Sequence, residues 1–131
     1  MTFASARSTY RQTGNSGVSV PDDPHQIIRV ILSELEKSLN VMKVANEAGN
    51  EYPPEHVNKA LRAIYLLQSS LDFEKGEDIA ISLFELYEFC RQNILAAFRK
   101  EEGAELAASA DAISGILDAW TEIGPQVRQV G

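Results

Sequence analysis

Apolar side chains recur at helical spacing in the first long patterned segment of the chain. The recurring residues are Ile27, Ile28, Ile31, Leu35, Leu39 and Met42. Residues three and four positions apart share one face of an α-helix, and charged residues occupy the other side here. In the preceding PDDPHQ, Asp22 or Asp23 can cap a helix, and Pro24 suits its first turn because proline lacks an N–H. The pattern predicts a helix over residues 24–48.

The segment AGNEYPPEH interrupts this pattern, and a second amphipathic segment follows it. Its inward positions are Val57, Ala60, Leu61, Ile64, Leu67 and Leu71. Their spacing predicts a helix over residues 54–73. Gly76 then predicts a stop, and Glu77 and Asp78 favour a new start because negative charge is stabilised at a helix N-terminus. We expect this third helix over residues 77–100.

The last patterned segment predicts a helix with the seam of an antiparallel or coiled-coil-like helix pair. Its apolar residues follow one another in steps of four and three: Leu106, Ala110, Ile113, Leu117 and Trp120. Gly124 and Pro125 end the segment. No segment alternates with a period of two for long enough to predict a strand.

Four such helices with short connections predict an all-α fold, an antiparallel up-and-down four-helix bundle over residues 21–125. Residues 1–20 are small and polar, which predicts a short, mobile N-terminal arm. Residues 126–131 are expected to form a C-terminal tail.

The 131-residue chain has the size of one domain. Its one cysteine, Cys90, cannot form an internal disulfide, which is typical of a reducing compartment. The N-terminus lacks the apolar core of a signal peptide, and no apolar run approaches the roughly 20 residues that span a bilayer. We therefore expect a cytoplasmic protein without membrane insertion. The formal net charge of −7 repels a phosphate backbone, so no nucleic-acid partner is expected.

Candidate catalytic chemistry is sparse. His25 and His56 have no nucleophile or positioned acid near them in sequence, so His25 is interpreted as a surface or capping residue and His56 in the same way. Cys90 lies on the inward stripe of the third helix and is interpreted as a small core side chain. No paired Glu-x-x-His motif of the kind used in metal-binding bundles occurs. We predict no enzyme, no cofactor and no metal site.

The chain carries more apolar surface than a one-sided helix needs. On the third helix, Ile81, Phe84 and Leu95 form a second line beside the core stripe, and on the second helix Leu66 and Phe73 are predicted to point away from theirs. A large exposed apolar patch often marks a partner site. Alternatively, these side chains wedge between helices, pack under loops, or bury against a second copy of the chain.

Several motifs occur in an order that resembles one protein family. They are DPHQIIRVILSELEKSLNVMKVA, KALRAIYLLQSSLDFEKGEDIAISLFELYEF and ISGILDAW, with TYRQ in the N-terminal segment. Together they resemble the flagellin-specific export chaperones, the FliS family, over nearly the whole chain.

The resemblance implies a cytoplasmic bundle without catalytic chemistry. It implies binding of the disordered C-terminal segment of flagellin, prevention of premature polymerisation, and delivery to the flagellar type III export apparatus, whose components are possible further partners. It also implies that Tyr10 and the arm cover part of the binding surface in the free protein. From spacing and resemblance together, the candidate partner-binding residues are Tyr10, Ile28, Leu66, Phe73, Ile81, Phe84 and Leu95. A self-associating helical-bundle module with another partner is the alternative, and we expect a monomer or a weak dimer.

Overall fold

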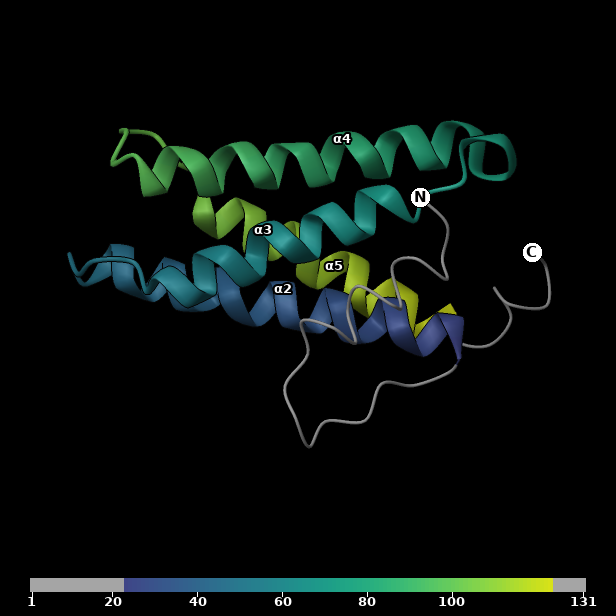
Figure 1. Cartoon of the computed structure of the whole chain (residues 1–131), viewed down its shortest axis with the longest axis horizontal. Helices are drawn as coiled ribbons and strands as arrows, with labels where there is room; N and C mark the ends of the chain where they lie inside the picture. The colour runs from purple at the N-terminus through teal and green to yellow at the C-terminus, as the bar shows by residue number, and fades with distance from the viewer. Residues whose placement is uncertain (1–22, 124–131) are drawn as a thin grey trace.

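The computed structural model describes residues 23–123, and four helices make up most of this range. They are α2 (Pro24–Glu47), α3 (Pro54–Ser69), α4 (Phe73–Phe98) and α5 (Leu106–Ile123). Successive helices run in opposite directions, and α2 and α4 lie on opposite sides of the bundle with α3 and α5 between them (Figure 1). The predicted antiparallel up-and-down four-helix bundle is confirmed. The predicted arm over residues 1–20, with Tyr10, and the tail over 126–131 lie outside the described residues.

Two helices begin at aspartate caps. The Asp23 side chain accepts a hydrogen bond of 3.0 Å from the backbone N–H of His25, with Pro24 in the first turn as expected. The Asp72 side chain accepts from the N–H groups of Glu74 and Lys75 at 3.0 and 3.1 Å. Each carboxylate therefore satisfies backbone donors that have no partner within the helix.

The predicted boundary between the second and third helices is partly correct, because the helical geometry breaks at Glu77, where a new start was predicted. The second helix ends at Ser69, and the third begins at Phe73 because Asp72 caps it. Gly76 lies inside α4, next to a kink at Glu77, whose φ of 46° is in the left-handed region. A Cβ atom at Gly76 would lie 2.8 Å from the Cβ of Ala80, so the kink requires the absence of a side chain there.

The core runs along the centre of the bundle and is built from all four helices. Leu66 belongs to it, with 1% of its surface exposed, so its predicted outward position is wrong. The prediction assumed one inward stripe, but α3 contacts both α2 and α4 and buries a wider arc. No helix between residues 23 and 123 is long and apolar enough to cross a membrane.

His25 and Trp120 join the start of α2 to the end of α5. Their rings stack with centroids 4.9 Å apart and planes 8° apart. The Trp120 Nε1–H donates to the His25 carbonyl at 2.9 Å, and His25 Nε2 donates to the Trp120 carbonyl at 2.7 Å. That carbonyl lies in the last turn of α5, where intrahelical donors run out. The ring of His25 is buried, so its interpretation as a surface residue is wrong.

Replacement of His25 by alanine should lower the free energy of unfolding by about 2 kcal/mol, because it removes the stacked ring and leaves the Trp120 carbonyl without this donor. His56→Ala is the matched control. His56 is half-buried and its Nδ1 lies 3.3 Å from the Ser38 hydroxyl, so a smaller loss is expected. Urea denaturation of both variants tests this difference, and equal losses would contradict it.

Candidate functional site

Most of the large apolar side chains that are exposed in the described range belong to α4. They are Phe73, Ile79, Ile81, Phe84, Phe89 and Phe98, and the others are Val44, Tyr65 and Ile123. The residues that α4 buries include two alanines and a cysteine: Ala80, Tyr87, Cys90, Ile94 and Ala97. Because this buried arc is narrow, the larger apolar groups of α4 remain at the surface.

Three of the predicted partner-binding residues lie together on this surface. Phe73, Ile81 and Phe84 are 48%, 48% and 39% exposed. The rings of Phe73 and Phe84 have centroids 6.0 Å apart and are tilted by 59°, a geometry typical of aromatic pairs. The first turn of α4 therefore folds Phe73 back toward Phe84.

The other candidates are placed differently. Leu95 lies on α4 but is only half-exposed. Ile28 lies on α2, across the bundle from α4, and packs partly against the core. Leu66 is buried and cannot contact a partner in this conformation. Tyr10 lies outside the described residues.

A polar cluster that sequence reasoning did not identify joins α3 to α4. It consists of Gln68, Glu88, Arg91 and Gln92. Glu88 accepts from Arg91 Nε at 2.9 Å, from Arg91 Nη2 at 2.6 Å and from Gln92 Nε2 at 2.9 Å. Gln68 Nε2 lies 3.3 Å from Glu88 Oε1 and 3.4 Å from the Phe84 carbonyl. The spacing of the α4 members is visible in the sequence, but the participation of Gln68 depends on how the helices pack.

These residues define the α3–α4 seam: Ile81, Phe84, Leu95 and the polar cluster. On α4, the spacing of Phe84, Glu88, Arg91 and Leu95 by three or four residues puts them on one face. The predicted second apolar line is therefore interrupted in its middle by charged and amide groups. Such a surface can receive an extended or helical segment, but it contains no catalytic arrangement.

Glu88 is held in its charged form. The hydrogen bonds from Arg91, followed by the one from Gln92, lower the pKa of Glu88 from its ordinary value of 4.5 to about 2. Its side chain is 34% exposed, and that of Arg91 is 39% exposed. Water therefore reaches both charged groups and weakens their ion pair.

Cys90 is a core residue, as predicted, and is fully buried. Its thiol lies 3.8 Å from the Ser109 carbonyl. Burial raises the pKa of Cys90 to about 11, which disfavours the nucleophilic thiolate. Within residues 23–123, no group of three or more histidine, cysteine, aspartate or glutamate residues is arranged to hold a metal ion.

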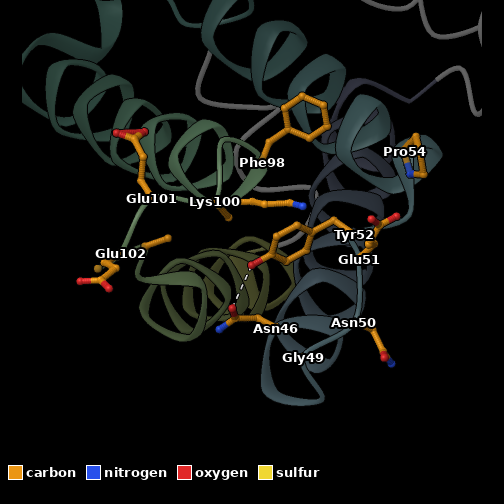
Figure 2. Close-up of a pocket in the computed structure, with 13 residues that line it drawn as sticks. Asn46, Gly49, Asn50, Glu51, Tyr52, Pro54, Phe98, Lys100, Glu101 and Glu102 are labelled. Atoms are coloured by element: carbon orange, nitrogen blue, oxygen red, sulfur yellow. Dashed lines mark hydrogen bonds between the residues drawn. The ribbon is translucent and has the colours of Figure 1, made fainter.

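A hollow of about 770 Å³ opens at the end of the bundle where α4 terminates, away from Phe73. Figure 2 shows it bordered by Tyr52 and Asn46 on one side and by Phe98 and Lys100 on the other. The Tyr52 hydroxyl donates to Asn46 Oδ1 at 2.9 Å. No histidine or cysteine is among the described residues that line this hollow.

Comparisons with known proteins point to one family. The family described as "Flagellar protein FliS" matches residues 5–127. The chain is 34% identical over 108 residues to the flagellar secretion chaperone FliS of Vibrio cholerae, covering 82% of this chain and 79% of that protein. It is 28% identical over 128 residues to the flagellar secretion chaperone FliS of Salmonella typhimurium, covering 96% and 95%. No solved structure gives a significant match.

The pKa of Glu88 should rise toward 4.5 when Arg91 is replaced by methionine, because the largest cause of its lowering is removed. In the parent protein, the pair stabilises the fold fully above the unfolded-state pKa near 4.5, and this contribution is lost as the pH falls toward 2. Titration of the Glu88 side-chain carbon by NMR measures the pKa directly. An unchanged value in the variant would contradict the role of Arg91.

Proposed function

The chain belongs to the FliS family of flagellar secretion chaperones, and on this basis we propose that its client is the disordered C-terminal segment of flagellin. The family is one of chaperones and not of enzymes. In this proposal the protein acts in the cytoplasm, keeps flagellin from polymerising before export, and aids its delivery to the flagellar type III export apparatus.

The observation that carries the proposal is the exposed apolar surface of α4. A disordered segment loses conformational freedom when it is bound, so its partner must supply enough apolar contact to offset that loss. Phe73 and Phe84 offer an aromatic pair, and Ile81 lies one turn before Phe84. Amphipathic segments bind such surfaces through apolar anchors spaced by three, four or seven residues.

The proposed client also explains why this surface is not filled by the bundle itself. A stable monomer rarely leaves a large apolar patch exposed, since the patch promotes aggregation. Here the buried arc of α4 is complete without Phe84 or Ile81, which leaves both side chains available. In the free protein, the predicted arm with Tyr10 is a candidate cover for the same surface.

The proposal is tested by isothermal titration calorimetry with a synthetic peptide that covers the last several dozen residues of flagellin from the same organism. One-to-one binding with a negative heat-capacity change is expected, because apolar surface is removed from water. Absence of binding to every flagellin of the organism would contradict the proposal. Light scattering that shows a salt-insensitive dimer burying Phe84 would instead favour self-association.

Replacement of Phe84 by glutamate should weaken binding of this peptide at least tenfold, because it places a charge among the apolar contacts. The free energy of unfolding should change by less than about 1 kcal/mol, since Phe84 is exposed. Val44→Glu is the matched control, because Val44 is an exposed apolar residue on α2. Calorimetry measures the change in peptide affinity, and urea denaturation measures the change in the free energy of unfolding. Equal weakening by both variants, or a loss of several kcal/mol in stability for Phe84→Glu, would contradict this role.

A further inference from the structure

The polar cluster lies between the two apolar parts of the α3–α4 seam. Phe84 and Leu95 are eleven positions apart on α4, which corresponds to about 16 Å along the helix. Glu88 is one turn after Phe84, and Arg91 is one turn before Leu95. A client segment that lies along α4 and contacts both apolar residues must therefore pass over the cluster.

Both carboxylate oxygens of Glu88 accept hydrogen bonds from within the protein. Its Oε1 atom receives hydrogen bonds from Gln68 and Arg91, and its Oε2 atom receives them from Arg91 and Gln92. These bonds fix the carboxylate in its charged form between the two helices. A covering segment therefore does not need to supply a donor to Glu88.

Arg91 differs from Glu88 because it retains donor capacity. A guanidinium group has five N–H donors, and the hydrogen bonds to Glu88 use its Nε and Nη2 atoms. In the described part of the chain, no hydrogen bond engages the Nη1 group of Arg91. The side chain is 39% exposed, so water can reach it in the free protein. A segment that covers this group with apolar atoms removes that water and leaves a charged donor unpaired, which is unfavourable.

We propose that Arg91, positioned by Glu88, which Gln68 and Gln92 in turn hold in place, is a specificity-determining residue of the client surface. It favours a client helix that places a hydrogen-bond acceptor, such as a carboxylate or amide oxygen, between two apolar anchors. It disfavours helices whose contact face is wholly apolar. This inference rests on the proposed function, because it assumes that the seam receives the flagellin segment.

Arg91 would both strengthen the binding of segments that carry an acceptor and weaken the binding of wholly apolar ones. Specificity is a difference between two affinities, and a buried donor without a partner lowers the affinity for the wrong ligand. A chaperone with an exposed apolar surface has particular need of such rejection, since amphipathic segments are common in other proteins. Glu88 has a supporting role, because it limits the orientations of the guanidinium group.

The test compares two peptides of equal length by calorimetry: the flagellin C-terminal segment and a designed leucine–lysine helix with a wholly apolar face. Arg91→Met should weaken binding of the flagellin segment about fivefold and strengthen binding of the designed helix by a similar factor. The ratio of the two affinities should therefore fall at least tenfold. Gln68→Leu, which makes the same part of the seam apolar from α3, should shift the ratio in the same direction.

Arg29→Met is the matched control. Arg29 Nε donates to Gln26 Oε1 at 3.0 Å on α2, at the same i,i+3 spacing, and its removal changes the net charge equally. If the ratio of the affinities for the two peptides is the same in Arg91→Met as in Arg29→Met, the proposal is overturned and Arg91 is an ordinary surface residue. If the flagellin segment fails to bind the parent protein, the proposed function fails. In that case the designed helix still tests the role of Arg91 in rejecting wholly apolar helices. If the designed helix binds Arg91→Met no more tightly than Arg29→Met, that role is overturned separately from the proposed function.

Discussion

The bundle depends on how little of α4 faces its core. The buried arc of this helix consists mainly of small residues, with Tyr87 and Ile94 as its large members. The larger apolar groups of the same helix, such as Phe84 and Ile81, lie outside this arc. Phe84 and Ile81 are therefore exposed as a consequence of the packing that holds α4 in place. In a FliS-family chaperone, this surface is the natural place to look for client binding.

The contacts among α2, α3 and α5 hold the rest of the bundle together. His25 and Trp120 fix the beginning of α2 against the end of α5, on the side of the bundle opposite α4. The deepest core belongs largely to α2, which packs against both α3 and α5. Because the exposed residues of α4 contribute little to this core, their chemistry can change to suit a client while the fold is kept. The polar cluster shows what such freedom permits: a charged pair can occupy the seam at little cost to stability.

Apolar periodicity predicted the four helices, because each has an inward stripe that a 3.6-residue period reveals, and the short connections between them predicted their antiparallel order. The break at Glu77 was predicted from Gly76, but the turn that Asp72 caps before it was missed, so α4 begins earlier than expected. The burial of Leu66 was missed because α3 has two packed neighbours.

The contacts that join distant parts of the chain were beyond sequence reasoning. His25 and Trp120 are 95 positions apart, and nothing local indicates that their rings stack. Helical spacing placed Phe84 and Ile81 beside the core stripe but left open whether they were exposed or wedged between helices, and the structure shows both exposed. Gln68 could not be assigned to the cluster, because its partner Glu88 lies on another helix. Whether the predicted partner-binding residues contact a client stays a prediction.

The most direct test of the central claim is a methyl NMR spectrum of the isoleucine side chains, recorded during titration with the flagellin C-terminal segment. The account predicts the largest shift change at Ile81, which is exposed on the seam, and little change at Ile27 and Ile113, which are buried in the core. Changes confined to Ile123 at the end of α5, with Ile81 unaffected in a saturated complex, would contradict it.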